Sequence, residues 1–268
     1  MPGRVVTITS GKGGVGKTTT TANLGTALAI LGKKVAVVDA DIGLRNLDVV
    51  LGLENRIVYD LVDVVEGRAR LRQALIKDKR YPELCLLPAA QTRDKNAVSP
   101  DQMAELTTQL SQDFDFVLVD SPAGIEQGFR NAIAGADQVV IVTTPEVSAV
   151  RDADRIIGLV EAAELPSPQL IVNRIKPAMV RRGDMMSVDD VKDILAIDII
   201  GIVPEDESVV ISTNRGEAVV FDANARAGLA FHNIARRLLG DRVPFQVLDE
   251  PAPPKPAGFF NRLFGRKY

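Results

Sequence analysis

The stretch Gly11-Lys12-Gly13-Gly14-Val15-Gly16-Lys17-Thr18, near the start of the chain, decides the fold. It follows an apolar run at residues 5–9 and precedes alanines and leucines at helical spacing over residues 17–31, so a strand turns into a helix here. Its spacing of a glycine, four further residues and Gly-Lys-Thr matches the phosphate-binding P-loop. A Gly-rich turn that merely closes a β-α connection is the alternative, but the full pattern favours nucleotide binding.

The residue types of this loop suit the binding of phosphate. Glycines leave the backbone free to curl with its N–H groups pointing inward, and the N-terminus of the following helix adds its positive end. We expect Lys17 to reach the outer phosphates and the hydroxyl of Thr18 to ligate Mg²⁺. A second lysine, Lys12, stands at the start of the loop and is unusual. The loop residues expected to hold ATP are Gly13, Gly14, Val15, Gly16, Lys17, Thr18 and Thr19.

Length and composition limit the class of protein. The 268 residues are 46% hydrophobic and 25% charged, which is compatible with one large α/β domain. A net charge of −3 provides no basic face for general nucleic-acid binding, so we expect no specific nucleic-acid partner. The single cysteine, Cys85, excludes an intramolecular disulfide and fits a reducing cytoplasm. We find no signal peptide at the start and no apolar run of the roughly 18 to 20 residues that span a bilayer.

Strand and helix patterns alternate along the chain. Apolar runs predict strands at residues 35–39, 84–87, 116–120, 138–143, 170–174 and 197–203, with helical patterns between most of them. We therefore predict an α/β P-loop NTPase fold, with a mostly parallel twisted sheet and helices on both faces. Short helices are expected within residues 57–76, and loops at residues 42–48 and 177–186.

Acidic residues end two of the predicted strands. Residues 35–39 lead into Asp39-Ala40-Asp41, and residues 116–120 end at Asp120. The carboxyl ends of parallel strands are where α/β sheets bind ligands. An apolar strand that ends in Asp is the Walker B arrangement, in which the carboxylate orients water on Mg²⁺. Beside a P-loop, Asp120 is therefore expected to take part in the metal site.

The composition changes near the end of the chain. We predict an ATPase domain at residues 1–240, a proline-rich tether at 241–257 and an amphipathic segment at 258–268. Drawn as a helix, the last segment gathers four apolar side chains in one arc, with Asn261, Arg262 and Gly265 opposite. We interpret it as a peripheral anchor for anionic lipid; a helix docked on its own domain and a disordered tail are the alternatives. The residues expected at the membrane are Phe259, Phe260, Arg262, Leu263, Phe264, Arg266 and Lys267.

The two-lysine loop, together with Asp41 and the segment Asp120-Ser121-Pro122-Ala123-Gly124, resembles the ParA/MinD family of deviant Walker A ATPases. The resemblance covers nearly the whole chain. It is strongest toward the septum-site members of that family, through residues 39–48, residues 201–206 and the terminal amphipathic segment. The nitrogenase iron protein of the same group needs cysteines that this chain lacks.

This resemblance implies roles for particular residues. Lys12 would reach the ATP of a partner chain across a homodimer interface, while Lys17 contacts the β- and γ-phosphates. Asp41 would orient the attacking water and Asp120 the Mg²⁺ shell. Two further groups follow from the resemblance, an adenine site formed by Asn173, Pro204, Glu205 and Asp206, and a dimer or partner surface that includes Lys12, Glu146, Asp152 and Asp154. Glu146 and Asp152 are possible partners of Lys12, although the acids of this helix could equally form a solvated face.

The implied function is an ATP-dependent switch. ATP would close a face-to-face homodimer, which attaches to the inner face of the cell membrane from the cytoplasm and positions the division septum by recruiting the inhibitor MinC. MinE would accelerate an otherwise slow hydrolysis of ATP. A flagellar-number regulator, a ParA-like partitioning ATPase and an ATP-dependent metabolic ligase remain alternatives.

Overall fold

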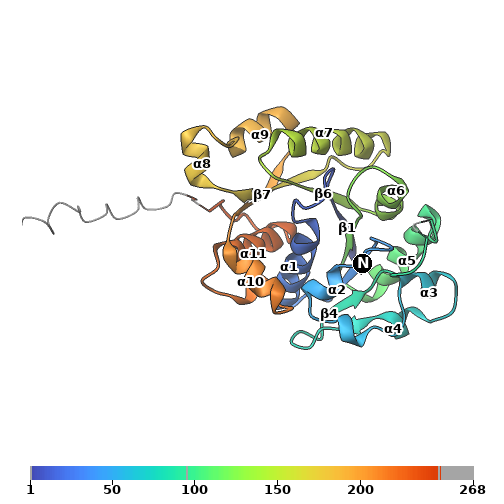
Figure 1. Ribbon diagram of the computed structural model, residues 1–268. Coiled ribbons are helices and arrows are strands. Elements are labelled where there is room, and N and C mark those ends of the chain that lie inside the picture. The colour runs from blue at the N-terminus through green and yellow to red at the C-terminus, as the bar shows by residue number, and fades with distance from the viewer. Residues whose placement is uncertain (1, 95, 247, 249–268) are drawn as a thin grey trace, which may run out of the picture.

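A single twisted sheet forms the centre of the protein (Figure 1). The computed structural model describes residues 2–94, 96–246 and 248, and within them eight strands follow the order β3-β4-β2-β5-β1-β6-β7-β8. Every neighbouring pair is parallel except β3 and β4. The mostly parallel sheet predicted from the sequence is therefore confirmed. The strands are β1 Arg4–Thr9, β2 Val35–Asp39, β3 Ile76–Lys77, β4 Leu84–Leu87, β5 Phe116–Asp120, β6 Gln138–Thr143, β7 Gln169–Ile175 and β8 Ile199–Pro204.

Helices cover both faces of the sheet. Alternate residues of β2 point to opposite faces, so Val37 packs in the cluster with α1 and α11, whereas Val38 packs in the cluster with α3 and α5. A third cluster lies under α7 and α9. Figure 1 shows α1, α10 and α11 on one side of the sheet and α7 and α9 on the other. The helices are α1 Lys17–Ile30, α2 Leu47–Val50, α3 Leu61–Val65, α4 Leu71–Ala74, α5 Pro100–Asp113, α6 Gln127–Ile133, α7 Val147–Ala162, α8 Pro177–Arg182, α9 Val188–Leu195, α10 Glu207–Asn214 and α11 Arg226–Leu238, with 3₁₀ turns η1 Glu54–Arg56 and η2 Val219–Phe221.

Three segments differ from the sequence prediction. Ile76, expected in a helix, pairs with Leu86 in an antiparallel strand, because a short apolar run fits either element. The loop predicted at 177–186 contains α8, which has Pro177 in its first turn and ends at Gly183 in the left-handed region. The loop predicted at 42–48 runs into α2, which begins at Leu47.

The strand order brings the predicted site segments together. β5 lies between β2 and β1, and Asp120 stands opposite both Asp39 and Ile8 in the register. Because these strands are parallel, their carboxyl ends meet at one edge of the sheet, beside the P-loop that follows β1. None of the helices in the described residues is long and apolar enough to cross a bilayer. The predicted amphipathic segment 258–268 lies outside the described residues, as does the predicted tether except for residues 241–246 and 248.

Candidate functional site

The P-loop backbone is left-handed at two of its glycines. Gly14 has φ 80° and Gly16 has φ 94°, both in the left-handed region, and α1 begins immediately after Gly16. A Cβ at Gly16 would lie 2.4 Å from Nδ2 of Asn173, so no larger residue fits without displacing that side chain. A groove of about 500 Å³ opens along the loop and is also lined by Asp41. This groove is large enough to hold part of a nucleotide.

Lys17 and Asp120 form a buried ion pair on the floor of the site. Nζ of Lys17 lies 2.8 Å from Oδ1 of Asp120, with the two side chains 7% and 1% exposed. The hydroxyl of Thr21 donates to the same oxygen at 3.0 Å. Thr21 is not among the residues predicted from the sequence; its position four residues after Lys17 on α1 is the signal, because residues four apart share a helix face. Asp120 therefore holds the lysine beside the P-loop.

Asp39 is a second buried carboxylate, for which the sequence predicts no role. Its Oδ1 accepts a hydrogen bond from the backbone N–H of Asp41 at 3.0 Å, and its Oδ2 accepts from those of Asn46 and Leu47, both at 3.1 Å. Burial and the neighbouring Asp120 raise the pKa of Asp39 to about 7, against the opposing effect of the backbone donors. Its position at the end of β2, opposite Asp120, is the signal that could have identified it. Asp39 ties the loop that carries Asp41 to the sheet.

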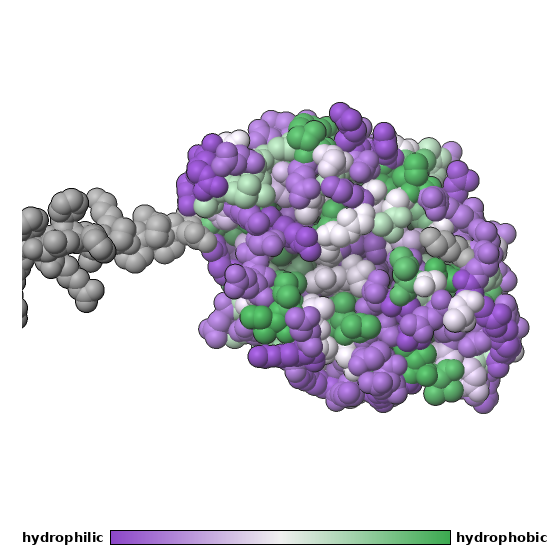
Figure 2. Space-filling view, in the orientation of Figure 1, coloured by the Kyte–Doolittle hydropathy of each residue, from purple (hydrophilic) through white to green (hydrophobic). Residues whose placement is uncertain are grey.

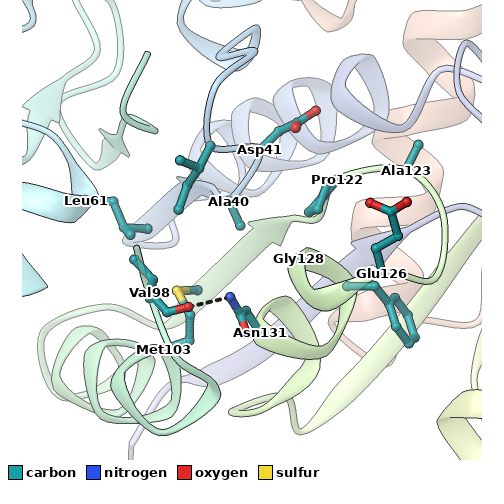
Figure 3. Close-up of a pocket in the computed structure, with 12 residues that line it drawn as sticks. Ala40, Asp41, Leu61, Val98, Met103, Pro122, Ala123, Glu126, Gly128 and Asn131 are labelled. Atoms are coloured by element: carbon teal, nitrogen blue, oxygen red, sulfur yellow. Dashed lines mark hydrogen bonds between the residues drawn. The ribbon is translucent and has the colours of Figure 1, made fainter. Parts of the chain in front are cut away.

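Asp41 stands where this loop begins. It lines the P-loop groove and also a smaller cavity of about 50 Å³ against α5 and α6. Figure 3 shows its carboxylate pointing away from the apolar end of that cavity, where Val98 and Met103 lie. At that end Nδ2 of Asn131 donates to the carbonyl of Val98 at 2.7 Å (Figure 3). Asp41 therefore lines the P-loop groove with its carboxylate turned away from the apolar end of the smaller cavity.

Lys12 extends in a different direction from Lys17. Its Nζ lies 3.0 Å from Oγ of Ser148 and 3.5 Å from Oε2 of Glu146, where α7 begins, and its side chain is 42% exposed. The structure therefore brings Lys12 and Glu146 together. Asp152 packs against the start of the same loop, where a Cβ at Gly11 would lie 2.7 Å from its Cβ, and its carboxylate lies 3.4 Å from the guanidinium of Arg155. Asp154 is exposed on the same helix.

The four residues predicted at the adenine line one small cavity beside the P-loop, together with Gly16 and Thr19. Asn173 uses its Nδ2 to donate to the carbonyl of Val15 at 2.8 Å, so its amide also braces the P-loop. Asp206 accepts from the N–H of Ser208 and from that of Ala227, at 2.9 and 3.0 Å. Burial would raise the pKa of Asp206, but these hydrogen bonds outweigh it and lower that pKa. Nδ2 of Asn173 and the Asp206 carboxylate are thus engaged with protein groups.

The side chains at the P-loop groove suit Mg²⁺, which binds partly through phosphate and water, better than a metal ion that needs only protein ligands. In the described part of the chain, no group of three or more His, Cys, Asp or Glu side chains could hold a metal ion. Mg²⁺ is usually bound by one or two carboxylates together with substrate phosphates and water. The hydroxyl of Thr18 at the groove and the carboxylate of Asp120 beneath it fit that requirement.

Comparison with known proteins agrees with this geometry. Residues 6–219 match the family described as the CobQ/CobB/MinD/ParA nucleotide binding domain. The septum site-determining protein MinD of Bacillus subtilis (strain 168) is 60% identical over 250 residues, which cover 92% of this chain and 93% of that protein. The chain belongs to the MinD family. The matched region includes the P-loop, both acidic strand ends and the proposed adenine residues.

Solved structures of MinD relatives have the same fold. The MinC:MinD cell division protein complex of Aquifex aeolicus contains a chain that matches with a TM-score of 0.85 and 53% identity, over 91% of this chain and 99% of that one. The septum site-determining protein MinD complexed with Mg-ADP from Pyrococcus horikoshii OT3 matches with a TM-score of 0.80 and 30% identity, over 88% and 95%. The family resemblance and the P-loop fold predicted from the sequence are confirmed.

Proposed function

We propose that this chain is an ATP-driven switch that places the division septum. It binds ATP and Mg²⁺, forms a homodimer, and hydrolyses ATP slowly to ADP and phosphate. Its 60% identity to a septum site-determining MinD supports this function over a flagellar-number regulator, a ParA-like partitioning ATPase or a metabolic ligase. Each of these alternatives would share the P-loop but not this set of relatives.

The contrast between two lysines of one loop carries the proposal. Lys17 is buried and faces the groove of its own chain, whereas Lys12 lies on the rim and reaches outward to α7. Two P-loops that face each other bring two polyanionic triphosphates together, and a cation supplied by the partner offsets that repulsion. Lys12 can leave Glu146 at little cost, because exposed ion pairs contribute about 0 to 1 kcal/mol. We assign Lys12 to the ATP of the second copy.

Exposed apolar side chains support a homodimer at this face. Leu44 and Val49 are 62% and 50% exposed and line the P-loop groove. Val210 and Ile211 are exposed on the neighbouring α10. Figure 2 shows apolar side chains over α10 and α2, surrounded by polar surface. A second copy of the chain would cover these side chains.

The chemistry follows from the same contacts. A bound triphosphate competes with Asp120 for the ammonium of Lys17, which then contacts the β- and γ-phosphates. Asp120 becomes available, with the hydroxyl of Thr18, to hold Mg²⁺ and its water. When bound, Mg²⁺ neutralises charge on the phosphate oxygens. Asp41 orients a water whose oxygen bonds to the γ-phosphorus while the bond to the ADP oxygen breaks, and the proton of that water leaves with phosphate or solvent.

Partners and location complete the proposal. The Aquifex aeolicus complex pairs a MinD relative with MinC, which supports MinC as a partner of this chain. Stimulation by MinE rests on the family resemblance. We assign the partner surface to α7 beside Lys12, with Glu146, Asp152 and Asp154. The protein would be cytoplasmic and would join the inner face of the cell membrane when ATP-bound, through residues 258–268 of both copies acting together.

Co-sedimentation with vesicles tests this function. The full-length chain is mixed with vesicles containing phosphatidylglycerol, in ATP or ADP, and its oligomeric state is followed by light scattering. We expect pelleting and dimers with ATP only; equal pelleting with both nucleotides would overturn the switch.

Lys12→Ala should keep nucleotide affinity within about threefold and lose the ATP dimer, because Lys12 contributes only across the interface. Lys34→Ala, an exposed lysine elsewhere, is the control, and normal dimers from Lys12→Ala would refute the assigned role of this lysine.

A further inference from the structure

The chain that follows α11 is held by one arginine. We call residues 243–246 and 248 the strap. The guanidinium of Arg237, on the last turn of α11, donates through Nε to the carbonyl of Val243 and through Nη2 to that of Pro244, both at 2.9 Å. Its Cζ lies 4.4 Å from the centre of the Phe245 ring. Three consecutive strap residues thus contact one cation, in hydrogen bonds and a cation-π contact.

The same guanidinium also binds the sheet. Nη1 of Arg237 donates to the carbonyl of Ile200 at 3.0 Å. Ile200 belongs to β8, which is an edge strand, and edge strands present backbone groups without a neighbouring strand. Arg237 therefore joins α11, the open edge of β8 and the strap. The planar fork of arginine can reach three carbonyls at once, which the single ammonium of a lysine cannot reproduce.

The other end of the strap is held at the start of the same helix. Nη2 of Arg226 donates to the carbonyl of Leu248 at 3.2 Å, and the side chain of Leu248 packs against the apolar cluster under α7 and α9. The helix from Arg226 to Arg237 is about 16 Å long at 1.5 Å per residue. An extended chain from residue 243 to residue 248 is also about 16 Å long. Because Arg237 holds Val243 and Arg226 holds Leu248, the two ends of the strap lie at opposite ends of α11, in the reverse order of the helix.

This path changes where the tail leaves the domain. At the C-terminal end of α11, Nη1 of Arg4 donates to the carbonyl of Leu238 at 2.9 Å, so the helix ends at the edge where β1 begins. At the other end, Ala227 donates to Asp206, which lines the proposed adenine cavity. The strap therefore returns the chain from the far edge of the sheet to the nucleotide edge. In Figure 1 the coloured chain ends between α8 and α11.

We propose that Arg237 and Arg226 set the origin of the C-terminal tail at the nucleotide edge, so that the anchors of two paired copies leave close to the surface where the copies meet. This inference rests on the proposed membrane role of the tail. Of the tether predicted at residues 241–257, only residues 249–257 follow the strap, so releasing the strap would lengthen the free tether to residues 241–257 and move its origin by about 16 Å. Effective concentration falls as about the −3/2 power of tether length, so avidity for vesicles should fall by about threefold from length alone.

Proteolysis of the full-length chain measures the strap directly. Chymotrypsin cleavage after Phe245, followed by mass spectrometry of the intact fragments, should be at least tenfold faster in Arg237→Gln than in the parent. Arg237→Lys should fall between them. Arg236→Gln is the matched control, because Arg236 contacts the exposed carboxylate of Asp241 and no strap residue, and its cleavage rate should match the parent. Arg226→Gln, which frees Leu248 at the other end of the strap but leaves Arg237 and the cleavage site in place, provides a milder opening should Arg237→Gln fold poorly.

Vesicle binding then tests the consequence. Arg237→Gln should bind phosphatidylglycerol vesicles with ATP about three- to tenfold more weakly, with unchanged hydrolysis of ATP in solution. Cleavage after Phe245 that is no faster in Arg237→Gln or in Arg226→Gln than in the parent would overturn the strap. Faster cleavage with parental vesicle binding would overturn its positioning role. If the parent chain does not bind vesicles with ATP, the proposed membrane switch is overturned instead. The cleavage rates would still decide whether Arg237 holds the strap.

Discussion

Nζ of Lys17 lies 2.8 Å from Oδ1 of Asp120, with both side chains almost completely buried at the floor of the P-loop groove. The other lysine of the loop, Lys12, is 42% exposed and contacts Glu146 at the rim. A buried ion pair is costly to break, because the remaining partner is an uncompensated charge in a poorly solvated site. The two lysines should therefore differ sharply in what they contribute to stability.

Lys17→Met should lower the free energy of unfolding by about 3 kcal/mol in nucleotide-free buffer, because Asp120 is left buried and unpaired. Lys12→Met, the matched control in the same loop, should change it by less than about 1 kcal/mol. Urea unfolding followed by circular dichroism measures both. Equal losses from the two variants would contradict the burial that separates them.

Stability should depend on pH through Asp39. The native pKa of about 7 lies above the ordinary value of 3.8, so between these values the native chain binds more protons than the unfolded chain. Stability from this group therefore falls as pH rises from about 4 to about 7, by at most about 1.4 kcal/mol per pH unit. Urea unfolding at a series of pH values, without nucleotide, should show this fall when the unfolding free energy of Asp39→Asn is subtracted from that of the parent. If the parent value minus the variant value rose with pH over the same interval, the raised pKa would be refuted.

Two glycines of the P-loop should respond differently to alanine. Gly16 has φ 94° and its added Cβ would meet Asn173 at 2.4 Å, so Gly16→Ala should destabilise the fold by about 1 to 3 kcal/mol. A Cβ at Gly13 meets nothing within 4 Å, so Gly13→Ala should stay within about 0.5 kcal/mol. Thermal unfolding compares them. Comparable shifts in melting temperature for the two variants would contradict the strain expected for alanine at position 16.

A charge in the predicted apolar arc should abolish membrane attachment. Phe260→Glu should eliminate ATP-dependent pelleting with anionic vesicles and leave basal hydrolysis of ATP intact, because the buried face of the anchor would carry an acid. Asn261→Glu adds the same charge on the opposite side of the helix and should retain most of the binding. If both variants pelleted like the parent, the terminal segment would not be the anchor.

Local pattern predicted much of the fold because the informative segments are long or strongly constrained. The P-loop needs its glycines at fixed spacing, and buried parallel strands appear as continuous apolar runs such as residues 116–120. Short elements were harder to predict from the sequence. Ile76 fits a helix or a strand until Leu86 supplies its antiparallel partner. The helix α9 at Val188–Leu195 has only eight residues, and the structure shows the cap in which Ser187 and Asp190 bond reciprocally.

The amino-acid sequence alone determined that the chain has a P-loop, a mostly parallel sheet and two acidic strand ends, because these depend on residue type and spacing over a few neighbours. Only the tertiary structure decided how they are connected. Asp120 meets Lys17 because β5 lies beside β1, Asp39 holds the loop of Asp41 because that loop folds back on β2, and Arg237 reaches Ile200 because α11 packs on an edge strand. Such contacts join residues far apart in the chain, and their energies depend on a burial that only packing creates.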